Sequence, residues 1–323
     1  MTILRALRGE LVVPDGLSGR HLLRVADWSA GELELLLDVA DELKQLQRQR
    51  VPHRLLEGRV LGLLFDKPST RTRVSFEVGI AQLGGTALFH PAEQLQLARG
   101  EPLRDTITVL SRYLDAVAVR ISSHEDVETL ARHASIPVLN ALTDAAHPCQ
   151  ALADLMTLRE RLGELSGRRL VWIGAGNNVC TSLIVAATTF GMHVVVATPP
   201  GHEPPDAAVE HARAAADRSG GSLELVRDPR EAAAGADALA TDVWTSMGQE
   251  AESARRCVDL ARYRIDAELL RAAGKQAIVL HCLPAHDGEE ITSEVLYGPQ
   301  SAVWDQAENR LHAQKALLAL VVD

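Results

Sequence analysis

The chain has 323 residues, of which 46% are hydrophobic and 24% charged, and its formal net charge is −10. This length is sufficient for two hydrophobic cores, and the composition is that of a globular protein. The acidic balance argues against nucleic acid as a partner, because phosphate backbones select basic surfaces. No apolar run approaches the roughly 20 residues that cross a membrane, and residues 1–10 lack a signal-peptide core. We therefore expect a cytoplasmic protein with neither a membrane nor a nucleic-acid partner.

The first half of the chain alternates short apolar runs with amphipathic stretches, which is typical of α/β architecture. Ser29 followed by Glu32 forms a capping box and predicts a helix toward Leu46. Strands are expected at 60–65, 86–89, 116–121 and 136–139, and a helix before Gly84 separates the first two.

A helix over 150–162 is expected to lead into a second series of elements. The further predicted elements are strands at 170–173, 194–198, 223–226, 238–240 and 277–280, a helix over 179–190, and a last helix over 309–322. We expect two domains, residues 1–149 with 309–323 and residues 150–308. Each should be a mostly parallel sheet flanked by helices, with the C-terminal helix returning to the first domain.

The segment Ser69-Thr70-Arg71-Thr72-Arg73 lies between a predicted strand and a predicted helix. Free N–H groups at a helix N-terminus, together with hydroxyl donors, bind anions. The two arginines add planar donor pairs that fit phosphate oxygens. A capped surface helix with two solvated arginines accounts for the same residues, so both interpretations stay open.

His147-Pro148-Cys149-Gln150 ends a loop just before the helix over 150–162. A histidine in that position could donate a hydrogen bond to a developing oxyanion. A helix-capping or core histidine is the alternative. The four cysteines form no Cys-x-x-Cys pair, which indicates reduced thiols rather than a disulfide framework or a structural zinc site.

The glycine-rich turn over 174–178 partly matches a dinucleotide-binding fingerprint. Val179 stands where the third glycine is expected, and Thr198-Pro199 ends the returning strand where an acidic ribose ligand is expected. These differences disfavour NAD. Two adjacent asparagines at a helix start suit a small polar ligand better.

Two loops follow predicted strands, at the strand ends where ligands bind in open α/β sheets. In the first, Asp242 could hold an ammonium group, and Ser246 with backbone N–H groups could hold a carboxylate; an ordinary surface turn is the alternative. In the second, His281 and Cys282 are adjacent. Neighbouring strand residues point to opposite faces, so we do not expect them to share a metal.

Taken together, seven segments in this order and spacing resemble the ornithine carbamoyltransferases over essentially the whole chain. They are Ser-Thr-Arg-Thr-Arg at 69–73, Ala-Val-Arg at 118–120, His-Pro-Cys-Gln at 147–150, Asn-Asn at 177–178, Asp-Val-Trp-Thr-Ser-Met-Gly at 242–248, His-Cys-Leu-Pro at 281–284 and Ala-Glu-Asn-Arg at 307–310.

The resemblance implies transfer of the carbamoyl group of carbamoyl phosphate to the δ-amine of L-ornithine, giving L-citrulline and phosphate without a cofactor or a metal. The implied carbamoyl phosphate ligands are Ser69, Thr70, Arg71, Thr72, Gln96, Arg120, His147, Gln150, Cys282, Leu283 and Arg310. The implied ornithine ligands are Asn178, Asp242, Ser246 and Met247. The implied catalytic residues are Arg120, His147, Cys282 and Asp242. The resemblance also implies a homotrimer with active sites at subunit interfaces, where Gln96 contacts the phosphate of a neighbouring subunit.

Three positions depart from the usual pattern of this family. Ala175 replaces a common acidic residue, Thr181 a common histidine, and Ala98 the glycine of the interfacial loop. Because the first two lie beside the predicted amino-acid site, a different acceptor, such as another diamino acid or putrescine, stays open. A non-catalytic binding paralogue and an NAD-dependent reductase are also considered. The retained arginines and His147 oppose the first of these, and the glycine-rich turn opposes the second.

Overall fold

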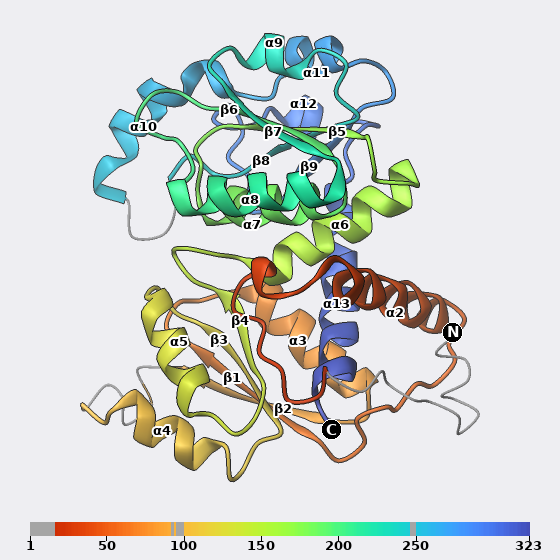
Figure 1. Cartoon of the computed structure of the whole chain (residues 1–323), viewed down its shortest axis with the longest axis vertical. Coiled ribbons are helices and arrows are strands. Elements are labelled where there is room, and N and C mark those ends of the chain that lie inside the picture. Colours follow the sequence, from red (N-terminus) through yellow and green to blue (C-terminus); the bar gives the residue numbers. More distant parts are fainter. Residues whose placement is uncertain (1–16, 92–93, 95–99, 246–249) are drawn as a thin grey trace. The chain divides into compact units, whose positions relative to one another are not determined.

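The computed structural model describes residues 17–91, 94, 100–245 and 250–323, and the chain divides into two compact units (Figure 1). Unit 1 comprises Met1–Ala153 and Asn309–Asp323, and unit 2 comprises Asp154–Glu308. Each unit contains one sheet whose paired strands are all parallel. The expected α/β fold with two helix-flanked parallel sheets is confirmed.

Unit 1 has a four-stranded sheet in the order β2-β1-β3-β4. Its strands are β1 (Val60–Phe65), β2 (Thr86–Pro91), β3 (Ala116–Arg120) and β4 (Val138–Leu142). Its helices are η1 (Val25–Asp27), α2 (Ala30–Arg48), α3 (Thr70–Gln82), α4 (Leu103–Leu110) and α5 (His124–His133), together with parts of α6 (Pro148–Leu162) and α13 (Val303–Val321).

The sheet of unit 1 is covered on both faces, with α4 and α5 on one side and α3 and α13 on the other (Figure 1). Val117 and Val119 of β3 belong to the buried cluster formed with Ile107 of α4 and Leu130 of α5. Side chains alternate between the faces of a strand, so Arg120 at the end of β3 lies on the opposite face. This alternation directs the arginine to the side of α3 and α13.

Local sequence signals account for the start of several elements in unit 1. Ser29 and Glu32 form the predicted capping box of α2. β4 begins two residues later than predicted, after Pro137, because proline has no N–H to donate to a sheet. Ser123 caps α5 by accepting from the backbone N–H of Asp126, a local signal for a helix that we did not predict.

The C-terminal part of α13 is anchored within unit 1 by buried polar groups. Lys315 Nζ donates to Gln82 Oε1 of α3 and lies 2.9 Å from His53 Nε2. Lys44 Nζ of α2 donates to Asn309 Oδ1 at 2.5 Å. Buried polar groups are stable only when they are hydrogen-bonded, so these contacts favour one register of the helix.

Unit 2 has a five-stranded sheet in the order β7-β6-β5-β8-β9. Its strands are β5 (Arg169–Ile173), β6 (His193–Ala197), β7 (Ser222–Val226), β8 (Ala238–Thr241) and β9 (Ile278–His281). Besides parts of α6 and α13, its helices are α7 (Asn178–Thr189), α8 (Asp206–Ser219), α9 (Pro229–Ala233), η4 (Glu250–Glu252), α10 (Ser253–Leu260), η5 (Ala261–Tyr263), α11 (Ala267–Ala273) and α12 (Ser293–Leu296).

In unit 2, α7 and α8 cover one face of the sheet, and α9 and α11 cover the other (Figure 1). From β5 the chain proceeds outward through β6 and β7, and then returns to place β8 on the other side of β5. The strand order therefore reverses between β5 and β8. Ligands of open α/β sheets bind at the carboxyl ends of the strands at such a switch point.

Two helices begin earlier than predicted. α6 begins at Pro148 instead of residue 150, because proline is well suited to the first helical position, where no N–H is needed. α13 begins at Val303 instead of residue 309, with Asp305 in its first turn. An acidic residue is favourable there, beside the positive end of the helix dipole.

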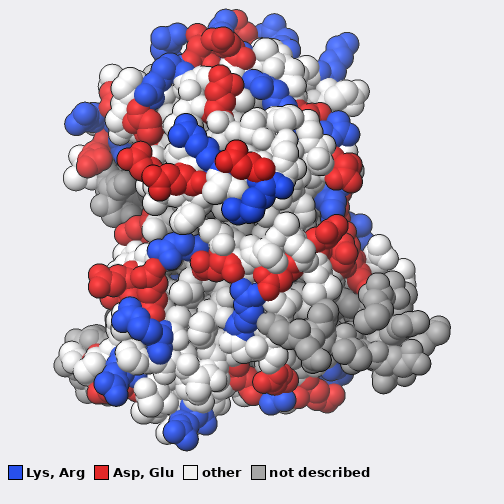
Figure 2. Space-filling model, in the orientation of Figure 1, with Lys and Arg blue, Asp and Glu red and all other residues white. Residues whose placement is uncertain are grey.

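The exposed surface carries charges of both signs. On the face in Figure 2, Lys and Arg side chains are interspersed with Asp and Glu side chains over both units. Among the described residues, no helix is both long and apolar enough to cross a membrane.

Candidate active site

Unit 1 brings together polar side chains at the carboxyl ends of β1 and β3. These strands are neighbours, and Phe65 at the end of β1 pairs with Arg120 at the end of β3. The chain leaving β1 enters α3, whose N-cap is Ser69. Ser69 Oγ accepts from the backbone N–H of Thr72 at 3.3 Å and lies 2.8 Å from Thr72 Oγ1. The predicted anion-binding segment is thus a capped helix N-terminus.

Thr72 is the point where two arginines from distant parts of the chain meet. Arg120 Nη1 donates to Thr72 Oγ1 at 3.4 Å, and Arg310 Nη2 of α13 donates to the same oxygen. Only 8% of Arg120 and 5% of Arg310 is exposed, and Thr72 is fully buried. Two largely buried guanidinium cations therefore meet at one neutral oxygen, where both would attract an anion.

His147 and Gln150 lie beside this pair of arginines. Arg310 Nη1 donates to Gln150 Oε1 at 3.3 Å, and Arg310 Nη2 lies 3.4 Å from His147 Nε2. Burial, together with the positive charges of Arg310 and Arg120, holds the pKa of His147 well below 6.5. The imidazole is consequently neutral at physiological pH, and a neutral imidazole has one N–H to donate.

Cys149 lies in the same segment but is not a reactive thiol. Burial raises the pKa of Cys149 to about 12, so the nucleophilic thiolate is scarce at neutral pH. Its Sγ donates to the backbone carbonyl of Asn140 at 3.4 Å. Cys149 therefore packs as part of the core.

The remaining unit 1 candidates are found at the exposed start of α3. Thr70 is its first residue, and Arg71 is exposed in its first turn. Ser69 and Thr70 also line a pocket of about 590 Å³, whose walls include Arg73 and Phe89. The Arg73 guanidinium lies over the Phe89 ring, 3.8 Å from its centroid.

Unit 2 places Asp242 at the switch point between β5 and β8. Asn177, in the turn after β5, donates from Nδ2 to Asp242 Oδ2 at 2.7 Å, while its Oδ1 caps α7. Cys282 Sγ, in the loop after β9, donates to Asp242 Oδ1 at 3.0 Å. The predicted residues Asp242 and Cys282 are thus in direct contact, and Asn178 is the first residue of α7.

The glycine-rich turn has a packing role of its own. A Cβ on Gly176 would come within 2.1 Å of the backbone nitrogen of Pro204, and the Gly176 N–H donates to the carbonyl of His202 at 2.7 Å. Close approach of the chain to itself therefore explains the glycine, without a dinucleotide.

The expectation that His281 and Cys282 point apart is wrong. β9 ends at His281, so the alternation of a strand does not extend to Cys282, and ligand atoms of both residues and Asp242 lie within 4.8 Å of one another. His281 Nδ1 accepts from the Leu283 N–H, and Nε2 faces Glu290 Oε1 at 3.1 Å. Both ring nitrogens are thus occupied by protein partners, as in a core histidine.

Leu283 has an uncommon backbone conformation for a branched residue, with φ +59°. Such outliers occur at functional sites, where the surrounding structure holds them. Three predicted site residues, Gln96, Ser246 and Met247, lie outside the described residues.

Two family models match the chain. Residues 20–160 match the carbamoyl-P binding domain of aspartate/ornithine carbamoyltransferase, and residues 166–321 match the Asp/Orn binding domain. The chain belongs to the aspartate/ornithine carbamoyltransferase family. The resemblance expected from the seven sequence segments is therefore confirmed.

Relatives within this family are similar over nearly the whole chain. The chain is 52% identical over 306 residues to "Ornithine carbamoyltransferase, anabolic" of Pyrococcus furiosus, covering 95% of this chain and 97% of that one. It is 54% identical over 305 residues to an ornithine carbamoyltransferase of Acidothermus cellulolyticus, covering 94% and 97%.

Solved structures of the family share the fold. The ornithine carbamoyltransferase of Pyrococcus furiosus aligns with a TM-score of 0.93 at 51% identity, over 96% of this chain and 99% of that one. The corresponding protein of Gloeobacter violaceus aligns with a TM-score of 0.85 at 46% identity, over 95% and 100%.

Asn177 belongs to the site, although the sequence pattern alone gives it no role of its own. It both caps α7 and donates to Asp242. Asparagine directly before a predicted helix is a strong capping signal, which could have indicated the first role. The contact with Asp242 joins residues 65 positions apart and needs the folded sheet.

Proposed function

We propose that the protein transfers the carbamoyl group of carbamoyl phosphate to the δ-amine of L-ornithine, forming L-citrulline and phosphate. The observation that carries this proposal is the pair Arg120 and Arg310, two largely buried cations that both donate to the neutral oxygen of Thr72. A phosphate group beside the N-terminus of α3 would be attracted by both guanidinium groups and by the helix N–H groups.

In unit 1, the proposed phosphate ligands are Ser69, Thr70, Arg71 and Thr72 at the start of α3. Arg120 and His147 would donate to the carbamoyl oxygen, Gln150 would bind the carbamoyl amide, and Arg310 would contact the same substrate. As the amine attacks the carbonyl carbon, a C–N bond forms and negative charge develops on that oxygen. The C–O bond to phosphate then breaks, phosphate leaves with the electron pair, and the amine loses a proton. Donors placed at the developing charge lower the barrier.

In unit 2, the proposed ligand is ornithine. Asp242 would bind the α-ammonium group, and Asn178, Ser246 and the Met247 backbone would bind the carboxylate. In the described structure the Asp242 carboxylate accepts from Asn177 and Cys282, so it already acts as an acceptor for donors at the switch point. Cys282 and Leu283 would line the reacting centre. The chemistry needs no covalent intermediate, so no nucleophilic role is proposed for Cys282.

Another amine as acceptor is the less favoured candidate. Relatives at about 52% identity from several organisms carry the name ornithine carbamoyltransferase, which supports ornithine. Ala175 contributes its backbone carbonyl to the indole N–H of Trp172 at 3.0 Å. That contact does not depend on the side chain at position 175, so the loss of an acidic side chain there leaves it in place.

We further propose that three copies of the chain assemble into a trimer, in which Gln96 of one copy reaches the phosphate site of the next. The pocket beside Ser69 and Thr70, together with exposed apolar side chains on α3 and the edge strand β2, supports a subunit contact there. These side chains are Val74, Val78 and Leu88. Sedimentation equilibrium should give the mass of three chains, and a monomer at micromolar concentration would exclude this assembly.

We place the protein in the cytoplasm. The four cysteines are free thiols, of which Cys149 and Cys180 are buried, and this pattern fits a reducing compartment. Cell fractionation that recovers the protein outside the cytoplasm would exclude this location.

The function is tested by incubating the purified protein with carbamoyl phosphate and L-ornithine. Phosphate and citrulline should appear in equal amounts, and omitting ornithine should stop both. Phosphate release without a ureido product, or no turnover, would overturn the proposal.

The reaction rate should rise between pH 7 and pH 9. The attacking δ-amine must be neutral, and below its pKa of about 10.4 the neutral fraction rises about tenfold per pH unit. The pKa of His147 is held well below 6.5, so its protonation does not change over this range. The measurement is kcat/KM for ornithine against pH at saturating carbamoyl phosphate. A flat profile would contradict rate-limiting attack by the free amine.

Replacing Asp242 with asparagine should raise the KM for ornithine by about 10²-fold or more. Removing one partner of a largely buried charge pair costs about 2–5 kcal/mol, and about 1.4 kcal/mol is a factor of ten. The KM for carbamoyl phosphate should change little, because Asp242 is proposed to bind only the amino acid. Asp217→Asn, at an exposed position of α8, is the matched control. An unchanged ornithine KM in Asp242→Asn would remove Asp242 from the site.

A further inference from the structure

The loop that presents His147 is closed by Thr143. This loop joins β4 to α6, and the Thr143 N–H donates to the Ala146 carbonyl at 2.9 Å. Thr143 Oγ1 accepts from the Ala146 N–H at 3.2 Å, and Asn140 Nδ2 lies 3.4 Å from the same oxygen. Thr143 is fully buried. Ala146, directly before His147, is thus held by the backbone N–H and the hydroxyl of Thr143.

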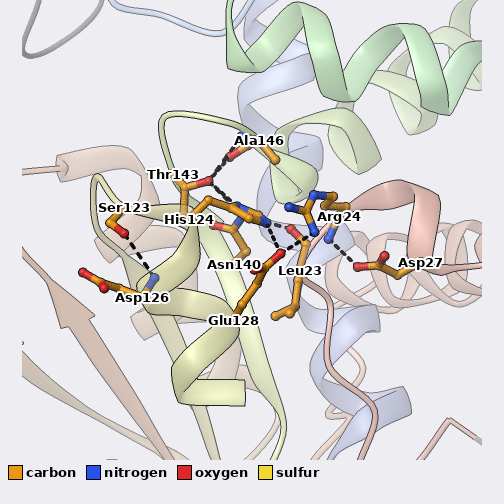
Figure 3. A network of polar contacts seen from close by, with 10 residues as sticks. All are labelled: Leu23, Arg24, Asp27, Ser123, His124, Asp126, Glu128, Asn140, Thr143 and Ala146. Carbon is orange, nitrogen blue, oxygen red and sulfur yellow. Dashed lines mark hydrogen bonds and ion pairs between the residues drawn. The ribbon is translucent and has the colours of Figure 1, made fainter. Parts of the chain in front are cut away.

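His124, the first residue of α5, makes a close contact with this hydroxyl. Its Nδ1 lies 2.7 Å from Thr143 Oγ1 (Figure 3). The Ala146 carbonyl is a second acceptor within reach of the Thr143 hydroxyl, at 3.4 Å. That carbonyl already accepts from the Thr143 N–H. Oγ1 already accepts from the Ala146 N–H and from Asn140 Nδ2, which occupies its two lone pairs. The tautomer that fits this arrangement has the Thr143 hydroxyl donating and Nδ1 of His124 accepting.

The opposite side of the His124 ring faces an ion pair. Nε2 lies 3.7 Å from Glu128 Oε1, and Arg24 Nη1 lies 2.8 Å from the same oxygen (Figure 3). The hydrogen bond from Arg24 lowers the pKa of Glu128, so the carboxylate is ionised. With Nδ1 as acceptor, the ring proton of neutral His124 is on Nε2, toward this carboxylate. Asp27, whose carboxylate accepts from the Arg24 N–H, also acts electrostatically on the ring and raises its pKa.

We propose that His124 is a positioning residue, which in its neutral form accepts from Thr143 and thereby holds the loop that presents His147 to the carbamoyl group. This inference rests on the proposed function in one respect, the role of His147. His124 itself is not proposed to contact the reacting atoms.

Acid should disrupt this link. Protonation of His124 places a proton on Nδ1, which can then no longer accept from the Thr143 hydroxyl. Thr143 must redirect its proton to the Ala146 carbonyl and accept from His124 instead. Burial is the main cause that lowers the pKa of His124 below 6.5, and the positive charge of Arg24 is the second. The negative charges of Glu128 and Asp27 oppose this shift. The rearrangement is therefore expected only below pH 6.5.

Matched substitutions separate positioning from general stability. His124→Leu removes the acceptor, whereas His124→Asn keeps an oxygen at the place of Nδ1. Thr143→Val removes the hydroxyl, whereas Thr143→Ser keeps it. Small misplacements of a catalytic group can cost up to about 10² in rate. We expect His124→Leu and Thr143→Val each to lower kcat about tenfold or more, with the KM for ornithine unchanged. His124→Asn and Thr143→Ser should recover most of that loss.

Two further readouts complete the test. The double variant His124→Leu/Thr143→Val should be no slower than Thr143→Val alone, because Thr143→Val already breaks the link to His124. Below pH 6.5, kcat of the wild type should fall more steeply than that of His124→Asn, which does not titrate. His133→Gln, at the exposed end of α5, is the control.

Wild-type kcat in His124→Leu, or equal loss in His124→Leu and His124→Asn, would overturn the positioning role and leave the proposed function intact. If the wild type made no citrulline, the proposed function would fail, and the link would be tested without turnover. In ¹⁵N-histidine spectra, His124→Leu should then shift the ring signals of His147, identified with a His147 variant. Unshifted His147 signals would overturn the inference.

Discussion

Replacing Arg71 with alanine should lower kcat/KM for carbamoyl phosphate by about 10²- to 10³-fold. Arg71 is exposed in the first turn of α3, where the free N–H groups of the helix and the hydroxyls of Ser69 and Thr70 favour a phosphate. Losing the charged partner of a phosphate costs about 2–5 kcal/mol, and about 1.4 kcal/mol is a factor of ten. Steady-state kinetics with carbamoyl phosphate as the varied substrate measure the effect.

The control for Arg71→Ala is Arg104→Ala, which removes an exposed arginine from α4 in the same unit. Both variants should keep the wild-type melting temperature and oligomeric state, because neither side chain is part of a core. Wild-type kcat/KM in Arg71→Ala would exclude Arg71 from phosphate binding.

Replacing His147 with alanine should lower kcat by about 10²- to 10³-fold, the usual effect of removing one donor to a developing oxyanion. The imidazole is buried and neutral, and it lies beside Arg310. Its donation strengthens as charge develops on the carbamoyl oxygen, so the loss should appear in kcat more than in the KM for carbamoyl phosphate. Rapid quench of a single turnover would show whether the chemical step is slowed.

Because His147→Ala also leaves a cavity, His147→Asn is the informative companion. It retains an N–H donor and should recover part of the lost kcat. If the loss came only from reduced stability, a retained N–H donor would not restore kcat in His147→Asn. His133→Ala, at an exposed position, should leave kcat unchanged. Full activity in His147→Ala would rule out His147 as a donor to the carbamoyl oxygen.

Much of the fold follows from local patterns in the sequence. The apolar runs of β1 and β5 and the capping residue Ser29 predicted their elements to within a few residues. α5 was missed, although Ser123 is a regular cap. Hydrophobic periodicity is difficult to recognise in a helix that has few buried residues, and in α5 these are Val127, Leu130 and Ala131.

The site was less accessible to sequence reasoning, because its contacts are between distant residues. Thr72 and Arg310 are 238 positions apart, and no local rule indicates that a residue of the last helix donates to the first turn of α3. The family resemblance named both residues, but not their contact. The expectation for His281 and Cys282 was wrong for a related reason, since it extended strand geometry one residue past the end of β9.

The most direct test of the proposed function is a competition for the carbamoyl group. The protein is supplied with carbamoyl phosphate and equal concentrations of L-ornithine, L-lysine, putrescine and L-aspartate, and the first ureido product is identified by mass spectrometry. The arrangement of Asp242 with Asn177 and Cys282, within a chain of this family, predicts citrulline as the main product. A predominance of any different carbamoylated amine would contradict it.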